Sequence, residues 1–570
     1  MLLICPSARP GTTGAARPAA RSAGSGDAGR STTWTRSSTT WTRRATAVAA
    51  GLLASLVALG PGTAHASPPA AGPVSQYVVR AQHGQLPALR LDLRRTGTVL
   101  RQVPLVDAEV VLLHRADALR FSHDPRVASV TPDGTVRLAG AAAAAGGAPQ
   151  SLADVADDVG ASALWDRGIT GRGVDVALID SGIAPVPGLT GAKVVYGPDL
   201  SFDSQDSETR HTDGFGHGTH LAGIIAGRSA AKGFSGIAPG ARLVSVKVAD
   251  AVGNADVSQV IAGIDWVVQH ADTDGLHIRV LNLSFGTDAS QAYTVDPLAY
   301  AAEQAWHAGI VVVVSGGNAG SSGRGLTNPA RDPYLLAVGA SDTSRRTPVV
   351  ASFSSRGDGV RNPDLVAPGV RITSLAAPGS TIDGLYGSRA RTGDGLFRGS
   401  GTSQASAVVA GAAALLLEAR PTLSPDQVKG LLTGTARDLR GKAQAQGAGL
   451  LEVADAAEAT APEGVQTFAR STGTGSLEAA RGSVHIGAGD AVLDGERDIF
   501  GNEVDTADLA TLEASRSAWK GAVFNGRAWT GSGSDSSSWG SQSWAGQAWA
   551  GQNWAGQAWA SQAWAASGWR

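Results

Sequence analysis

The sequence predicts an α/β fold of three layers, in which a mainly parallel central sheet is buried between helices. Between about residues 152 and 457, short apolar runs rich in β-branched residues alternate with longer segments of helical period. The apolar runs are nearly continuous, as expected for strands that helices cover on both faces. Because the chain has 570 residues, we also expect about two to four separate units.

The strands and helices of this region are predicted from hydrophobic periodicity. Strands are expected at 174–179, 243–248, 280–283, 310–314, 335–338 and 372–375. Helices are expected at 218–227, 257–270, 297–308, 403–418 and 425–435. In such sheets the reactive groups collect at the carboxyl ends of the strands, so the residues that follow these strands are the candidate site.

Composition excludes several classes of function. The formal net charge is −2, which gives no basic field to attract nucleic acid or an anionic membrane. The single cysteine, Cys5, lies in the extreme N-terminal leader. For the mature chain we therefore expect no cysteine nucleophile, no thiolate zinc site, no iron–sulfur cluster and no intramolecular disulfide.

Residues 1–66 have the parts of a leader and signal peptide. Arg43 and Arg44 precede the apolar run 45–60, and Ala64-His65-Ala66 forms a small-x-small cleavage site. The run is too short to span a bilayer comfortably, although an interfacial or core helix is the alternative. We predict cleavage after Ala66 and a secreted, extracellular protein.

Residues 67–150 are expected to form a small α+β domain followed by a linker. Strands are predicted at 77–80, 98–100, 108–113 and 127–130, and a short helix at 116–123. The Ala- and Gly-rich segment 139–148 that follows has the composition of a loose linker and suits proteolytic cleavage.

Three residues of the central region, 151–457, are candidates for nucleophilic catalysis. Asp180 directly follows the predicted strand 174–179, although an aspartate there is also a common turn residue. His217 lies between two glycines at the start of a predicted helix, and histidine is the usual general base near neutral pH. Its partner in the His-x-x-His pair, His220, has no local carboxylate to complete a metal site, so we expect it to be a buried structural residue.

Ser403 and Asn318 complete the candidate site. Ser403 opens the predicted helix 403–418, where backbone N–H groups would face a developing oxyanion, although a simple helix cap is the alternative for it alone. Asn318 follows the predicted strand 310–314, and its side-chain amide can donate to the same oxyanion; a left-handed turn residue is the alternative.

The order Asp, His, Ser along the chain is the order found in subtilisin. Asp180-Ser181-Gly182, His217-Gly218-Thr219-His220 and Gly401-Thr402-Ser403-x-Ala405 follow one another on alternating strands and helices. In this the chain resembles the subtilisin-like serine peptidase family (S8, subtilases), over roughly residues 150–457. Two positions depart from the common pattern, Gln404 where many members have Met and Ala407 where many have Pro.

The resemblance implies a subtilisin-like fold and an acyl-transfer mechanism. His217 would take the proton of Ser403, Asp180 would orient His217, and Asn318 with the Ser403 amide would hold the oxyanion. Ser284, Phe285 and Gly286 look like the family's substrate-binding strand and pocket wall, and Gly253 lies on the segment that looks like the opposing strand. An extended protein or peptide substrate would pair between these edges.

The resemblance also implies that residues 67–150 are a propeptide and that a structural calcium ion could be bound. The run 124–133 resembles the end of the inhibitor-type propeptides of the family, which implies an intramolecular inhibitor removed by self-cleavage. No cofactor is expected to be required. Calcium often stabilises members of the family as a structural ion, and Asp199, Asp203 and Asp206 are loop carboxylates that could contribute.

The C-terminal part divides into an extension, 458–517, in which no motif is recognised, and a tryptophan-repeat tail, 518–570. Tryptophans recur at 519, 529 and 539 and then at every fifth position to 569. This period fits a solenoid or, alternatively, a flexible low-complexity segment. Exposed tryptophans could bind carbohydrate, cell wall or protein. No membrane anchor is recognised at the C-terminus, and a monomer is expected.

Three functions remain open at this point. The first is an active, secreted endopeptidase. The second is a binding or adhesion protein in which the tail acts and the peptidase serves only maturation. The third is a catalytically silent homologue, against which the complete set of Asp180, His217 and Ser403 argues.

Overall fold

The computed structural model describes residues 74–529, apart from 83, 104–107, 133–148, 206–208, 230–232, 324, 393–394, 484 and 489–490. Of two compact units, Met1–Ala70 lies outside the described residues, whereas Ala71–Arg570 contains all of them. The predicted signal peptide, the linker 139–148 and the tryptophans from position 539 onwards therefore fall outside the part that the structure describes.

The first described segment, 74–132, is a small α+β unit. In chain order its elements are β1 (Val74–Ala81), α1 (Leu86–Thr96), β2 (Thr98–Val103), β3 (Ala108–His114), α2 (Arg115–Ser122) and β4 (Val127–Pro132). The strands pair antiparallel in the order β2-β3-β1-β4, and their side chains form a hydrophobic cluster distinct from the main core. Helix α1 was not predicted; Leu86, Leu89 and Leu93, which share its buried face, are its signal in the sequence.

The central sheet is parallel except at one edge. Its strands are β5 (Asp175–Asp180), β6 (Val194–Asp199), β9 (Arg242–Lys247), β10 (Ile278–Leu283), β11 (Val311–Ser315), β12 (Leu336–Asp342), β13 (Val349–Val350) and β14 (Leu365–Pro368). The order is β13-β12-β11-β10-β5-β9-β6, with β14 also paired to β12. Only the β12–β13 pairing is antiparallel. The predicted mainly parallel sheet is confirmed.

One predicted strand belongs to a different sheet. The segment 372–375 forms β15 (Ile372–Leu375), which pairs antiparallel with β17 (Leu396–Gly399), and β17 pairs with β16 (Arg391–Thr392). Between β14 and β15 the chain turns at Arg371, whose φ is 54°. This turn carries the chain out of the central sheet, so the assignment of 372–375 to that sheet was wrong.

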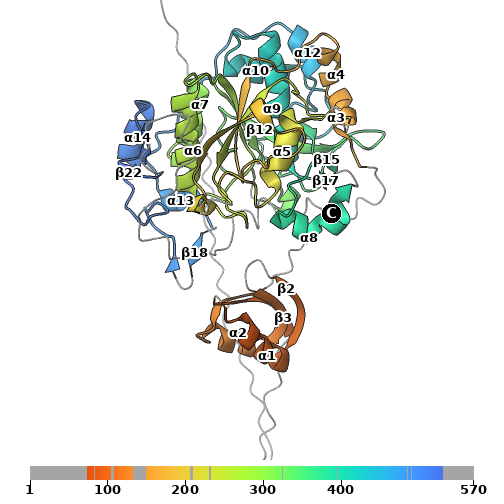
Figure 1. The fold of residues 1–570 in the computed structure, drawn as a ribbon. Helices are drawn as coiled ribbons and strands as arrows, with labels where there is room; N and C mark the ends of the chain where they lie inside the picture. Colours follow the sequence, from red (N-terminus) through yellow and green to blue (C-terminus); the bar gives the residue numbers. More distant parts are fainter. Residues whose placement is uncertain are drawn as a thin grey trace, which may run out of the picture. The chain divides into compact units, whose positions relative to one another are not determined.

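Helices cover both faces of the sheet. Figure 1 shows α6 (Val257–His270) and α7 (Pro297–His307) on one face, and α5 (His217–Ala226) and α9 (Thr402–Ala419) on the other. Further helices are α3 (Leu152–Asp158), α4 (Ala161–Trp165), α8 (Thr381–Ala390), α10 (Pro425–Gly434), α11 (Ala443–Gln446) and α12 (Val453–Glu458), and β7 (Arg228–Ser229) pairs with β8 (Phe234–Ser235). Among the described helices, α9 alone has the length and hydropathy of a membrane span, and it is the buried central helix of this core.

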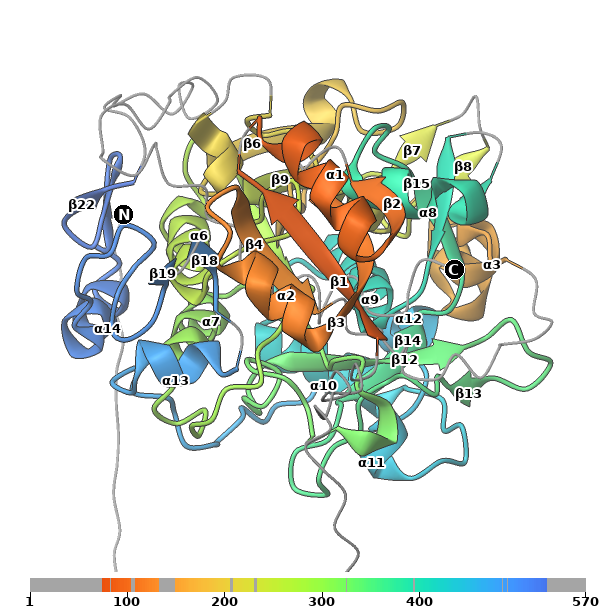
Figure 2. The same ribbon diagram turned by 90° about the horizontal axis from the view of Figure 1, so that it is seen from below.

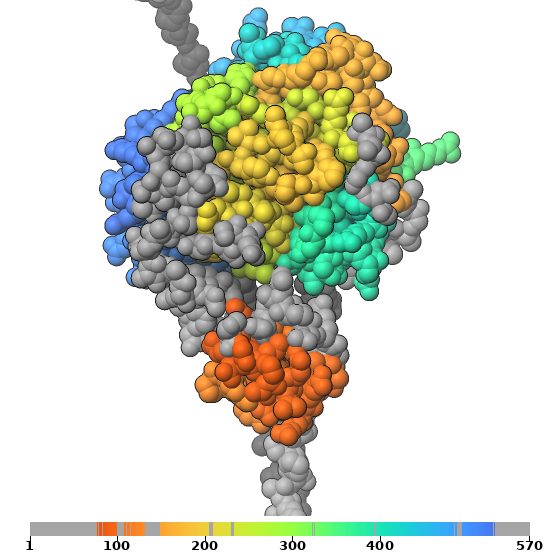
Figure 3. Space-filling view, in the orientation of Figure 1, coloured from red at the N-terminus to blue at the C-terminus, as the bar shows by residue number. Residues whose placement is uncertain are grey.

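The residues after 458 pack against α6 and α7 and share their core. They form α13 (Leu477–Arg481), β18 (Gly487–Ala488), β19 (Ala491–Val492), α14 (Thr506–Ala514), β20 (Trp519–Lys520), β21 (Val523–Phe524) and β22 (Arg527–Ala528). Figures 1 and 2 both show α13 and α14 beside α6 and α7, and Figure 3 shows this segment, in blue, against the yellow-green surface of the central region.

Two tryptophans fasten this segment to the core. Trp519 and Trp529 are buried, and the Trp519 Nε1 donates to the Ala262 carbonyl of α6 at 2.8 Å. The sequence-based boundary at residue 518, where the tryptophan-repeat tail was expected to begin, falls inside this packed segment. The first two tryptophans of the repeat are therefore core residues of the described fold.

Candidate active site

Asp180 and His217 form a buried pair at the carboxyl end of the sheet. Asp180 is the last residue of β5, and His217 is the first residue of α5. The His217 Nδ1 lies 3.0 Å from each Asp180 carboxylate oxygen, and both side chains are 1% exposed. Because a carboxylate accepts, Nδ1 carries the proton in this pair, and Nε2 is the acceptor in the neutral ring.

Glycine 218 allows this close approach between α5 and the end of β5. A Cβ at Gly218 would lie 2.1 Å from the Gly182 carbonyl oxygen and 3.1 Å from the Asp180 Oδ1. Any side chain at this position would push the helix away from the strand. The glycine after His217, noted in the sequence, thus sets the separation of the histidine from its carboxylate.

Asp213 is a further polar residue of the site that sequence reasoning missed. Its Oδ1 accepts from the Gly216 N–H at 2.6 Å, and its Oδ2 accepts from the Thr219 N–H at 2.7 Å, at the start of α5. The Ser181 hydroxyl donates to Asp213 at 2.8 Å and lies 3.2 Å from the Asp180 Oδ1. Burial raises the pKa of Asp213, and these donors lower it. An acidic residue just before a glycine-flanked helix start was its available signal.

Ser403, at the start of α9, lies near Asp180 because it contacts Ser284, which follows β10, the strand next to β5. Ile179 of β5 pairs with Leu283 of β10, so Asp180 and Ser284 leave the sheet side by side. The Ser403 Oγ donates to the Ser284 carbonyl at 3.0 Å. The Ser403 N–H is among the first of α9, and such groups have no acceptor within the helix.

Asn318 is oriented by the residue before Ser403. Its Oδ1 accepts from the Thr402 N–H at 2.9 Å and from the Thr402 hydroxyl at 3.1 Å, which turns its Nδ2 the other way. A Cβ at Gly401 would lie 3.6 Å from both the Asn318 Nδ2 and the Ser403 N. These two donors therefore border the same space. Gln404, one of the two departures, is buried and places its Oε1 against Gly401.

The two predicted substrate edges leave the sheet on either side of Asp180. Ser284, Phe285 and Gly286 follow β10, and Gly253 lies in the segment after β9, while β5 is the strand between β9 and β10. Gly253 has a φ of 86° in a turn that Asp250 holds: the Asp250 carboxylate accepts from the Val252 and Asn254 N–H groups. Burial raises the pKa of Asp250 to about 7.

Two of the residues considered for calcium, Asp199 and Asp203, are engaged with donors of the protein. The Asp203 Oδ2 accepts from the buried Lys247 ammonium at 2.6 Å, and Asp199 accepts from the Ser201 and His211 N–H groups. Asp206 lies outside the described residues. In the described part of the chain, no three His, Cys, Asp or Glu side chains gather as a group that could hold a metal ion.

His220 is a buried structural residue, as predicted. It is fully buried, and its Nε2 donates to the Phe397 carbonyl at 3.1 Å. Burial, with a smaller contribution from His217, lowers its pKa to about 3, so the ring is neutral at ordinary pH. Among the described residues, no group of three His, Cys, Asp or Glu side chains that could hold a metal includes His217 or His220.

Comparison with known proteins agrees with this geometry. Residues 171–450 match the model of the Subtilase family. Subtilisin Savinase of Lederbergia lenta is 38% identical over 296 residues, which cover 51% of this chain and 94% of Savinase. The chain belongs to the subtilase family. Subtilisin E of Bacillus subtilis (strain 168) is 36% identical over 371 residues, 64% of this subtilase and 84% of subtilisin E.

A third relative is matched over less of its length. Serine protease AprX of Bacillus subtilis (strain 168) is 40% identical to this subtilase over 276 residues, which cover 46% of the subtilase and 61% of AprX. The relatives and the central sheet together confirm the subtilisin-like α/β fold, and the chain is a serine peptidase of the subtilisin type. The segment 458–529 lies beyond the residues that the family model matches.

Proposed function

We propose that this subtilase is a secreted serine endopeptidase in which Asp180, His217 and Ser403 form the catalytic triad. The observation that carries the proposal is the pair of 3.0 Å contacts between the His217 Nδ1 and the Asp180 carboxylate, beside the strand end where Ser403 is held. A carboxylate, an imidazole and a hydroxyl in that order suit acyl transfer to a serine.

The first half of the reaction forms an acyl-enzyme. The Ser403 hydroxyl, which here donates to the Ser284 carbonyl, would have to donate to the His217 Nε2 in the reactive complex; such catalytic hydrogen bonds often form fully only when substrate is bound. His217 takes the proton as Ser403 Oγ attacks the scissile carbonyl, and Asp180 stabilises the imidazolium. His217 then protonates the leaving amine, and water releases the acyl group by the same steps in reverse.

The developing oxyanion is bound by the Asn318 Nδ2 and the Ser403 N–H. Their common border at Gly401 supports this role, since both donors face one small space. Thr402 fixes the amide of Asn318 before substrate arrives, so little reorganisation is needed during the reaction.

The substrate is a protein or peptide that binds in extended form between two edges. Gly253 belongs to one edge, and Ser284, Phe285 and Gly286 belong to the other. Main-chain hydrogen bonds to both edges would hold the segment before the cleaved bond, and the side-chain pockets would provide selectivity. No nucleic acid and no cofactor have a part in this proposal.

The N-terminal parts would act in export and control. Residues 1–66 would direct secretion and be removed after Ala66. Segment 74–132, which folds around its own hydrophobic cluster, would be an intramolecular inhibitor that self-cleavage within the following linker releases. Binding of the tail to cell wall or carbohydrate is a separate possibility that concerns residues beyond 529.

The deciding experiment is intact-mass measurement of residues 67–570 after incubation at neutral pH. The wild type is compared with Ser403→Ala and with Ser424→Ala, which removes a serine that caps α10. We expect the wild type and Ser424→Ala to lose the segment up to about residue 150, and Ser403→Ala to keep it. If no variant is cut and a fluorophosphonate probe leaves Ser403 unlabelled, the triad is not functional and a binding protein centred on the tail is the better proposal.

A further inference from the structure

A short part of the C-terminal segment lies between the continuations of both proposed substrate edges. On one side, Arg481 of α13 bonds Asp256, three residues after Gly253: its Nε lies 2.7 Å from the Asp256 Oδ2, and its Nη2 lies 3.3 Å from the Oδ1. Asp256 also caps α6 through the Ser258 N–H. Arg481 is therefore bonded to the residue that joins the first edge to α6.

On the other side, α13 is fastened to the residues just after Gly286. The Thr287 hydroxyl donates to the Ala480 carbonyl at 2.7 Å, and the Ser290 N–H donates to the Ala479 carbonyl at 3.1 Å. The Ser483 N–H and hydroxyl donate to the Asp288 carboxylate at 2.7 and 2.6 Å. Residues 477–483, which we name the bridge segment, thus contact the continuations of both edges within seven consecutive positions.

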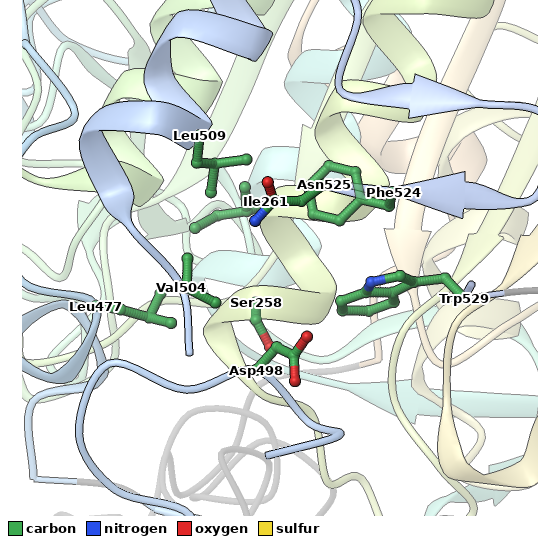
Figure 4. A pocket seen from close by; sticks show the side chains of 9 residues that line it. All are labelled: Ser258, Ile261, Leu477, Asp498, Val504, Leu509, Phe524, Asn525 and Trp529. Carbon is green, nitrogen blue, oxygen red and sulfur yellow. The ribbon is translucent and has the colours of Figure 1, made fainter. Parts of the chain in front are cut away.

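The bridge segment is rigidly placed. Arg481 is 0% exposed, and its remaining donors bond the Gly495 and Arg497 carbonyls. Leu477 and Ala480 belong to the hydrophobic core of the central domain. Figure 4 shows Leu477 next to Val504 at a small cavity that Ser258 and Ile261 of α6 and later residues of the extension also line. A fully buried, paired arginine in this setting fixes position more than it adds stability.

Gly482 brings the bridge segment into direct contact with Asp288, two residues after the second edge. Its φ is 71°, and a Cβ there would lie 2.3 Å from the Asp288 Oδ1 and 2.8 Å from the Asp288 carbonyl carbon. The two chains therefore touch, and a single added methyl group would separate them.

The position of this contact along the groove follows from the chain. Ser284, whose carbonyl accepts from Ser403, lies three residues before Thr287. Three extended residues span roughly 10 Å, so the bridge segment lies about three or more substrate residues away from the cleaved bond.

We propose that the bridge segment is the far wall of the substrate groove and sets the distance between its two edges. This inference rests on the proposed endopeptidase function. Substrate residues close to the cleaved bond bind the edges alone, whereas residues about four or more positions away bind where Arg481, Thr287 and Asp288 hold the edges together. The extension is then a specificity-determining part of the peptidase for long substrates.

The test compares short and long substrates in a variant whose added side chain forces Gly482 away from Asp288. The assay uses enzyme that has lost its N-terminal segment but keeps the whole C-terminal extension. Two peptide anilides serve as substrates, one of two residues and one of six residues, and the last two residues before the anilide are the same in both. Gly482→Ala is compared with Gly521→Ala, a glycine of the same extension with a φ of 60° and open space around its Cβ position. Both substitutions strain a left-handed residue, but only the first one displaces the second edge.

We expect Gly482→Ala to lower kcat/KM for the six-residue substrate by about tenfold or more, mainly through KM, and to leave the two-residue substrate within about twofold. The Gly521→Ala variant should have the kcat/KM of the wild type for both substrates. Thr287→Val, which removes the bond to Ala480 without adding a wedge, should act in the same direction as Gly482→Ala.

Two results would overturn the proposal. Equal losses on both substrates, or no loss on either in both Gly482→Ala and Thr287→Val, would assign the bridge segment to stability alone. A wild type that cleaves neither substrate and resists a fluorophosphonate probe refutes the endopeptidase function instead, so the two failures are distinguishable. Thermal melting of each variant shows whether the altered protein is folded when it is assayed.

Discussion

The carboxylates of Asp180 and Asp213 are joined through one hydroxyl group. Ser181 donates to the Asp213 Oδ1 at 2.8 Å, lies 3.2 Å from the Asp180 Oδ1, and accepts from the Gly218 N–H at 3.0 Å. Asp213 also binds the Gly216 and Thr219 N–H groups. The helix start that holds His217 and the carboxylate that faces it are thus aligned by the same network.

Replacing Asp213 by Asn should therefore impair catalysis. The amide of Asn can accept at one position only and must place its NH₂ against a donor, which costs about 1–3 kcal/mol for the buried site. We expect a lower kcat with little change in KM, because the geometry of Asp180 and His217 changes and the substrate edges do not. Steady-state kinetics measure this split.

Asp505→Asn is the control for that substitution. Asp505 caps α14 through the Ala507 and Asp508 N–H groups, far along the chain from the triad. Asn is as good a cap as Asp, so stability and kcat should both stay near the wild-type values. If Asp213→Asn lowers the melting temperature but leaves kcat intact, Asp213 serves folding only.

The triad itself should show the unequal costs expected of a cooperative unit. Ser403→Ala should reduce kcat by about 10⁶-fold, and Asp180→Asn by about 10⁴-fold, since the latter favours the wrong tautomer of His217. Melting temperatures should change little in Ser403→Ala. Active-site titration before the kinetic assay ensures that residual wild-type enzyme does not set the measured rate. A loss of less than tenfold in Ser403→Ala would contradict the assignment of the nucleophile.

Glu303 should make stability fall as the pH rises. Burial raises the pKa of Glu303 from 4.5 to about 7. The Ser471 N–H, which donates to the Glu303 Oε2 at 2.7 Å, lowers this pKa, but by less than burial raises it. Because the folded state holds the proton more tightly than the unfolded state, the contribution is fully present below about pH 4.5 and is lost as the pH rises to about 7. Glu303→Gln should flatten the melting temperature between pH 5 and 8.

The exposed Glu463 provides the matched control for Glu303. Glu463→Gln also replaces a glutamate by glutamine, but at an exposed position of the extension, so no buried group is altered. Its melting temperature should follow the wild-type dependence on pH. A wild-type curve that stays level from pH 5 to 8 would show that Glu303 does not titrate in the folded protein over this range.

A second carboxyl pair should loosen the extension at alkaline pH. Asp265 of α6 and Glu513 of α14 are both buried and hydrogen-bond each other, and burial raises the pKa of both groups. Burial raises the pKa of Tyr300 of α7, and the negative charges of Glu513 and Asp265 raise it further. Loss of the protons of this pair at high pH would leave two buried anions that repel each other.

Glu513→Gln should therefore raise the melting temperature at pH 9 by about 2–4 °C relative to the wild type. The amide keeps a hydrogen bond to Asp265 and removes the second negative charge. At pH 5, where the carboxyl pair keeps its proton, the two proteins should melt alike. Equal melting temperatures at pH 9 would show that the pair stays protonated under alkaline conditions.

Much of the central fold could be predicted because its strands and helices have strong apolar patterns. Helix 257–270 was predicted with its observed bounds, and strand 280–283 with its carboxyl end in place. Hydrophobic periodicity does not, however, show which strands pair with one another. Strand 372–375 was therefore placed in the wrong sheet, and the short β14, which ends in a proline, was missed.

The candidate site was predicted at its centre and missed at its margins. Asp180, His217 and Ser403 stand in motifs that can be recognised locally. Asp213 acts through backbone N–H groups, and its position just before a glycine-flanked helix start is a weak signal that many surface aspartates share. Arg481 acts on Asp256 across 225 positions, and no local pattern reports a pair so far apart.

The burial of Trp519 against Ala262 also sets an order of events during synthesis. The two residues lie 257 positions apart, and Trp529, ten residues further on, completes the same core. A nascent chain that has reached residue 457 already carries every residue of the triad, but the outer side of α6 is still uncovered. Packing of the core on this side of α6 therefore cannot be completed before residue 529 is available.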